Sequence, residues 1–101
     1  MDRNETIKRI RAGLRKRSGK AWSVKGGRGT AWGWIRVSAP PARLVDGYIS
    51  DDDRRELATL LGIEKIHNQG ENIPCSNQYY QEYVDRAEGY IPRVVGRPYW
   101  D

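Results

Sequence analysis

The sequence contains no phenylalanine and only one cysteine, one histidine and one methionine. A single cysteine excludes a disulfide bond within the chain, and one cysteine with one histidine supplies too few ligands for a structural zinc site. No apolar run approaches the roughly 18 residues that a membrane-spanning helix requires. Residues 1–20 also lack the apolar segment of a secretory signal, so we expect a cytoplasmic protein.

The length of 101 residues predicts a single domain over residues 1–101. With no phenylalanine, four Trp and six Tyr must supply the aromatic bulk of the core. Each of these side chains carries a polar group that needs a partner when it is buried. A chain of this length buries a modest fraction of its surface, so we expect a small core and marginal stability.

The charge is unevenly distributed along the chain. Residues 1–44 hold 12 Lys and Arg against 2 Asp and Glu, a net charge of +10. Residues 45–101 hold 6 Lys and Arg against 11 Asp and Glu, a net charge of −5. This asymmetry predicts either an anionic partner for the first part of the chain or attraction between the two parts.

Three segments have helical periodicity and helix-ending signals. The first can be capped by Asp2 or Asn4, the second by Ser50 and the third by Ser76 or Asn77, all of them residue types that cap helix N-termini. A glycine ends each segment, as is common at helix C-termini. The apolar stripes are formed by Ile7, Ile10 and Leu14, by Leu57, Leu60 and Leu61, and by Tyr79, Tyr80, Tyr83, Val84 and Ala87.

Two segments, residues 20–25 and 30–38, alternate as strands do. The intervening sequence Gly26-Gly27-Arg28-Gly29 suits a turn, so the segments predict an antiparallel hairpin. The alternation places Ile35 and Val37 on one face together with Ala31 and Gly33, whose small size would let a helix approach closely. The opposite face then carries Trp32, Trp34 and Arg36, joined by Ser23 and Lys25 if the register allows.

The predicted class is therefore α+β, with about three helices on one face of a small antiparallel sheet and the order α-β-β-α-α-tail. Residues 64–75 are expected to form a loop with at most a short extended piece. The tail, residues 90–101, is expected to be an edge strand or a packed extended arm, because its two prolines cannot lie in a central strand.

No motif predicts an enzyme, a cofactor or a metal site. Gly13 and Gly19 enclose one residue too many for a phosphate-binding loop, and no Ser or Thr follows Lys20. Cys75 and His67 lie on one loop with no sign of an activated nucleophile, so they are interpreted as structural residues. Three consecutive acids after Ser50 stabilise a helix start and need no bound cation.

Four segments cover most of the chain: "RSGKAWSVKGGRGTAWGWIRVSAPP", "ISDDDRRELATLLGI", "HNQGENIP" and "YYQEYVDRAEGY". Together they resemble a family of small uncharacterised bacterial and phage-type proteins. The layout is similar to that of small α+β modules associated with large polyvalent phage and plasmid proteins. This resemblance implies a cytoplasmic accessory or interaction protein and assigns no catalytic residue.

Two functions fit these observations. The first is nucleic-acid binding, with cations contacting phosphates and tryptophans stacking on bases. The second is a protein-interaction module, in one version a homodimer, that uses a surface rich in Trp, Tyr and Arg. For either partner the candidate binding residues are Arg15, Lys16, Arg17, Lys20, Lys25, Arg28, Trp32, Trp34 and Arg36.

Overall fold

A computed structural model describes residues 1–90 of the chain and confirms the α+β class. The element order is α-β-β-α-β-α, so a strand interrupts the predicted run of two helices. The elements are α1 (Arg3–Ser18), β1 (Ser23–Gly26), β2 (Trp34–Ser38), α2 (Asp51–Leu61), β3 (Glu71–Pro74) and α3 (Asn77–Glu88), with short 3₁₀ turns η1 (Gly29–Ala31) and η2 (Pro41–Arg43). The predicted C-terminal strand or arm lies outside the described residues.

The sheet has the order β1-β2-β3, and both of its strand pairs are antiparallel. The predicted hairpin is confirmed, with Val24 opposite Val37 and Lys25 opposite Arg36. Residues 64–75, expected to form a loop that could hold a short extended piece, contain β3, which pairs along β2 and which the predicted element order did not include. The four residues of β3 follow a glycine and end with a proline, which leaves too short a pattern to distinguish from a loop.

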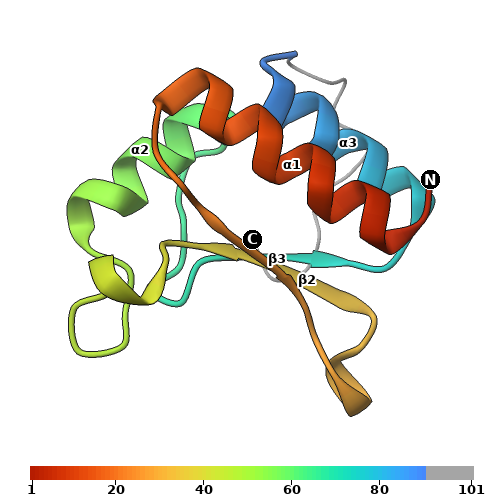
Figure 1. The fold of residues 1–101 in the computed structure, drawn as a ribbon, viewed down its shortest axis with the longest axis horizontal. Coiled ribbons are helices and arrows are strands. Elements are labelled where there is room, and N and C mark those ends of the chain that lie inside the picture. Colours follow the sequence, from red (N-terminus) through yellow and green to blue (C-terminus); the bar gives the residue numbers. More distant parts are fainter. Residues whose placement is uncertain (91–101) are drawn as a thin grey trace.

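The three helices lie on one side of the sheet, and the other side carries no helix within residues 1–90 (Figure 1). Side chains of the sheet alternate, and those facing the helices are buried. The predicted face is confirmed for Ile35 and Val37, each of which is 0% exposed. The core also contains Ile10, Leu14, Trp22, Val24, Leu57, Leu61, Ile73, Tyr80, Tyr83 and Val84.

The close helix contact lies elsewhere than predicted. Strand β2 begins only at Trp34, so Gly33 precedes it and Trp32 follows the 3₁₀ turn η1. Close packing occurs instead between α1 and α3, at Gly13, where an added Cβ would lie 2.8 Å from the carbonyl oxygen of Ala87. The placement of Trp32 on one strand face beside Trp34 is therefore wrong, because η1 interrupts the alternation.

The predicted helix caps are confirmed. The side chains of Asp2, Ser50 and Ser76 each accept a hydrogen bond from a backbone N–H in the first turn of α1, α2 and α3, respectively. The glycine that follows each helix has a left-handed conformation, with φ of 73°, 65° and 98° in chain order. Local sequence signals therefore set the helix boundaries correctly.

Replacing Ser50 with alanine should destabilise the protein by about 0.5–2 kcal/mol. The Ser50 hydroxyl accepts a hydrogen bond of 3.2 Å from the Asp53 N–H, and alanine would remove this acceptor. Chemical denaturation of the full chain measures the change, with Ser50→Asn as the control because asparagine also caps helices. Equal stability of the alanine and asparagine variants would contradict a capping role for Ser50.

Candidate nucleic-acid interface

Two arginines of α1 attach the helix to the hairpin. Arg3 donates hydrogen bonds to the carbonyl oxygens of Gly27 (2.9 Å) and Trp32 (2.6 Å), and its guanidinium lies 4.3 Å from the centre of a Trp32 ring. Arg11 donates to the carbonyl oxygen of Val24 on the edge strand (2.8 Å). These contacts hold the loop of residues 27–33, here called the hairpin loop, in a fixed position beside the N-terminus of α1.

Arg17, one of the predicted binding residues, is engaged within the fold. Its guanidinium donates to the carbonyl oxygens of Leu60 (2.7 Å) and Arg86 (2.8 Å), near the C-termini of α2 and α3. Carbonyl groups at helix C-termini lack partners within the helix and carry partial negative charge, so a cation there is stabilising. Arg17 thus joins the C-terminal ends of the three helices.

Some of the charge asymmetry is satisfied within the molecule. Lys20 lies 2.7 Å from a Glu56 carboxylate oxygen and 3.6 Å from one of Asp53, and the hydrogen bond to Glu56 is the main cause that raises the pKa of Lys20. Arg43 also bonds Asp53 (3.0 Å), which is buried. Attraction between the basic and acidic parts of the chain, one of the two predicted consequences, therefore occurs in the fold.

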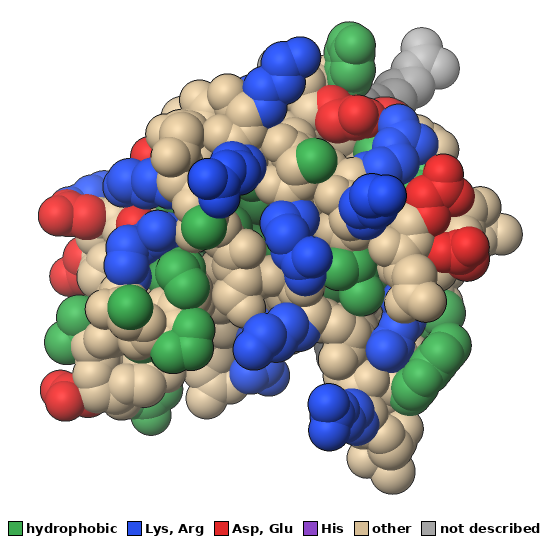
Figure 2. Space-filling view, viewed as in Figure 1, with side chains coloured by type: hydrophobic (Ala, Val, Ile, Leu, Met, Phe, Trp, Pro, Cys, Tyr) green, Lys and Arg blue, Asp and Glu red, His purple; other side chains and the backbone are tan. Residues whose placement is uncertain are grey.

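A second group of cations has no such partner. Lys8, Arg15, Lys16, Lys25 and Arg28 are exposed and form no hydrogen bond or ion pair with any described residue. Lys and Arg side chains spread over the face that carries α1 and the hairpin, whereas acidic side chains lie mainly toward the two sides of this view (Figure 2). The uncommitted positive charge is thus concentrated on the N-terminal helix and the hairpin.

The face of the sheet that points away from the helices is polar and basic. We call this the open face; its side chains belong to Ser23, Lys25, Trp34, Arg36, Ser38, Asn72 and Pro74. Trp34 and Arg36 lie on it as predicted, and the register adds Ser23 and Lys25. Arg36 makes a long hydrogen bond of 3.4 Å to the Asn72 side chain. Trp34 is half-buried and lies opposite Pro74.

A hollow of about 270 Å³ lies at the end of the open face where β2 leaves the sheet. We call it the sheet hollow. Its polar lining within residues 1–90 consists of Ser23, Lys25, Arg36, Ser38 and Gln69, none of which is acidic. These residues offer cations and hydrogen-bond donors.

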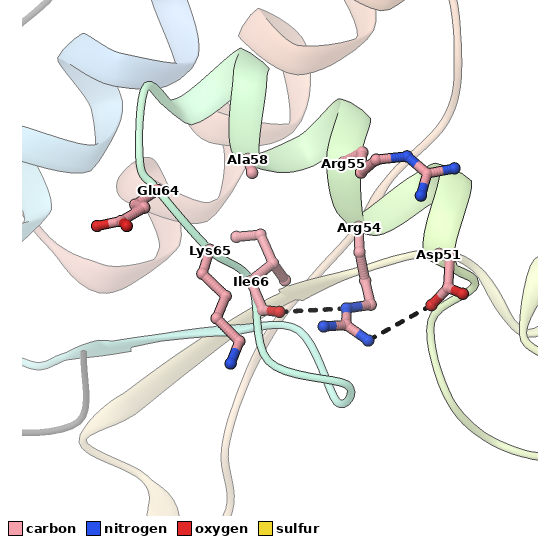
Figure 3. A pocket seen from close by; sticks show the side chains of 7 residues that line it. All are labelled: Asp51, Arg54, Arg55, Ala58, Glu64, Lys65 and Ile66. Atoms are coloured by element: carbon pink, nitrogen blue, oxygen red, sulfur yellow. Dashed lines mark hydrogen bonds and ion pairs between the residues drawn. The ribbon is translucent and has the colours of Figure 1, made fainter.

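A second hollow, of about 160 Å³, lies between α2 and the segment that follows it (Figure 3). Both acidic and basic residues line this hollow, and Arg54 already has partners within the chain. Arg54 donates to the Ile66 carbonyl oxygen (3.2 Å) and lies 3.5 Å from an Asp51 carboxylate oxygen, while Glu64 and Arg55 point away from this contact. This hollow is less suited to an anion than the sheet hollow.

Cys75, His67, Glu71 and Tyr80 are residue types that can act in catalysis, but their surroundings in the fold are those of structural residues. Cys75 is exposed, and His67 pairs with Gly70 in a tight turn that precedes β3. Buried Glu71 accepts hydrogen bonds from the Tyr83 hydroxyl (3.0 Å) and the Asn72 N–H (3.2 Å). Burial, with a contribution from nearby Cys75, raises the pKa of Tyr80 to about 12, which keeps its hydroxyl protonated at neutral pH. Within residues 1–90, no group of three or more His, Cys, Asp or Glu is placed to hold a metal ion.

Comparison of the chain with protein-family models, curated proteins and solved structures finds no match. None of the helices in residues 1–90 combines the length and the apolar character needed to cross a membrane.

The sequence did not single out three residues that shape this surface. Arg3 holds the hairpin loop through hydrogen bonds to residues that follow it by 24 and 29 positions in the sequence, and no local pattern predicts contacts of that separation. Gln69 and Asn72 reach the open face only because β3 joins the sheet. A signal for this strand existed in the alternation of Glu71 and Ile73 with Asn72 and Pro74, but it spans only four residues.

Proposed function

We propose that the chain is a non-catalytic accessory module that binds nucleic acid through the open face and the adjoining hairpin loop. The observation that carries this proposal is the distribution of uncommitted cations. Lys25 on the open face and Arg28 in the hairpin loop are exposed and have no hydrogen-bond or ion-pair partner among residues 1–90. Lys8, Arg15 and Lys16 are also without such a partner there, but they belong to α1, on the other side of the sheet. Unneutralised cations on the hairpin, beside the open face, favour a phosphate-rich partner.

Aromatic side chains next to these cations support the proposal. Trp32 is 55% exposed in the hairpin loop, and Arg3 fixes its position through hydrogen bonds and ring stacking. Trp34 lies on the open face, two residues from Arg36. Aromatic rings next to a basic groove bind single strands by stacking on bases, at roughly 1–3 kcal/mol per base. This combination favours single-stranded over double-stranded nucleic acid.

The affinity for a single-stranded oligonucleotide should fall steeply as salt concentration rises. Each phosphate contact contributes about 0.7 to the slope of log affinity against log salt concentration for a single strand. Charge reversal at Lys25 and Arg28 removes two such contacts, so binding should weaken for all base sequences and the slope should decrease by about 1.4. Fluorescence anisotropy with labelled oligonucleotides over a salt series measures both quantities.

Lys65→Glu is the matched control for these variants. Lys65 is also exposed and without an ion pair to a described residue, but it lies beside the second hollow, away from the hairpin. Lys65→Glu changes the net charge by the same amount as charge reversal at Lys25 or Arg28 alone. An equal loss of affinity in Lys65→Glu would show an effect of overall charge alone, and no complex at low salt would contradict the proposal.

Protein binding is the second candidate function. Exposed apolar side chains in the loop between η2 and α2 favour it, because Val45 is 59% exposed and Tyr48 is 47% exposed. Exposed aromatic and arginine side chains are also typical of protein interfaces. A homodimer is the simplest form, and concentration-dependent sedimentation of the full chain tests it. Substitution of Tyr48 with serine should weaken a protein complex and leave oligonucleotide affinity unchanged.

A further inference from the structure

The sheet hollow contains two cations that face one another across the hairpin. Lys25 on β1 lies directly opposite Arg36 on β2, so the two side chains emerge on the same face. Like charges at directly opposed positions destabilise an antiparallel sheet. Among the described residues that line the hollow none is acidic, and the adjacent strand offers the neutral amide of Asn72. This arrangement points to an anion supplied by a ligand.

Neutral donors complete the hollow. Ser23 and Ser38 are also directly opposed, two positions along the hairpin from the two cations and on the same face, and both line the hollow with Gln69. Serine hydroxyls and a glutamine amide donate hydrogen bonds to oxygen atoms without adding charge. Two cations beside two hydroxyls and an amide match an anion with several oxygen acceptors, of which phosphate is the biologically common example.

The shape of the hollow indicates where the phosphate would lie in a longer ligand. Its remaining lining is apolar and comes from Ala39, Pro41, Leu44 and Gly47, in the segment that follows β2. These residues close one end of the open face, whereas the other end leads toward Trp34. A volume of about 270 Å³ is at the lower limit of ligand pockets, so it suits one phosphorylated unit rather than a long segment.

We propose that the sheet hollow binds a terminal phosphate group, held by Lys25 and Arg36 with hydrogen bonds from Ser23 and Ser38. The phosphate chemistry follows from the hollow alone. The phosphate could belong to the end of a nucleic-acid strand that continues over Trp34, and this assignment rests on the proposed function. A small phosphorylated molecule would present the same group.

The test uses the full chain and three probes: pyrophosphate, a single-stranded oligonucleotide with a 5′-phosphate, and the same oligonucleotide with a 5′-hydroxyl. Calorimetric titration gives the affinities, and thermal unfolding with pyrophosphate gives an independent measure, because a ligand that binds only the folded state raises the melting temperature. The variants are Lys25→Gln, Arg36→Gln and the pair together. Lys65→Gln is the control, since it removes an exposed cation outside the hollow.

We expect pyrophosphate to raise the melting temperature of the wild type and of Lys65→Gln, but not of the double variant. The 5′-phosphorylated strand should bind the wild type at least about tenfold more tightly than the 5′-hydroxyl strand, and this preference should vanish in the double variant. The double variant should fold at least as stably as the wild type, because the opposed charges are gone.

The outcomes separate the phosphate site from the proposed function. Pyrophosphate binding that depends on Lys25 and Arg36, without binding of either oligonucleotide, would support the site for a small phosphorylated molecule and overturn the nucleic-acid function. Equal binding of both oligonucleotides, with no effect of pyrophosphate, would overturn the site and leave the nucleic-acid function standing. Equal pyrophosphate effects in the double variant and the wild type would also overturn the site.

Discussion

Replacing Ile35 with alanine should destabilise the protein by about 2–5 kcal/mol, the usual range for a large-to-small change in a packed core. Ile35 is 0% exposed and lies in the central strand, opposite Gly26 on one side and Ile73 on the other. The helices cover this face, so a cavity there cannot fill with solvent. Urea denaturation of the full chain measures the loss, which is large for a chain of 101 residues because small domains are marginally stable.

Trp34→Ala is the comparison that separates stability from binding. Trp34 is adjacent to Ile35 in sequence but lies on the open face and is half-buried. Its loss should cost much less stability than the loss of Ile35 and should weaken oligonucleotide binding by roughly the 1–3 kcal/mol of one stacked base. A destabilisation as large as that of Ile35→Ala would make Trp34 a core residue and would contradict its role on a binding surface.

The parts of the fold that could be predicted from sequence are those with strong local signals. Ser50 and Gly62 bound α2 because a cap and a left-handed glycine act within one turn of the helix. The alternation around Ile35 also identified the buried face of β2 correctly. Strand β3 was missed because its pairing with β2 joins residues about 36 apart, and its own four residues carry little pattern.

The candidate site was predictable only in part, for a similar reason. The basic character of α1 is evident in the sequence, but which cations are already bound depends on tertiary contacts. Arg17 and Lys20 have partners 33 or more residues away, whereas Lys25 and Arg28 have none among the described residues. The opposition of Lys25 and Arg36, on which the phosphate site depends, follows from the hairpin register and not from either segment alone.

Replacing Gly70 with alanine should destabilise the protein by about 2–4 kcal/mol, because two separate costs combine at this position. Gly70 has φ of +103°, a conformation that side chains rarely adopt, and it is the residue through which the chain enters β3. An added Cβ would also overlap the carbonyl oxygen of Val37, a backbone atom of the central strand. Relief of that overlap requires β3 to move away from β2. Denaturant unfolding measures the effect.

Gly89→Ala is the matched control for this prediction. Gly89 has nearly the same φ, +98°, but the nearest atom to its added Cβ is 3.3 Å away and belongs to the Arg17 side chain, not to backbone. Alanine at position 89 therefore carries the conformational cost without a collision against backbone. If both variants lost the same stability, the contact with Val37 would contribute nothing. A larger loss at Gly70, with weaker oligonucleotide binding, would show that docking of β3 against β2 also shapes the open face, since β3 supplies Asn72 beside Arg36.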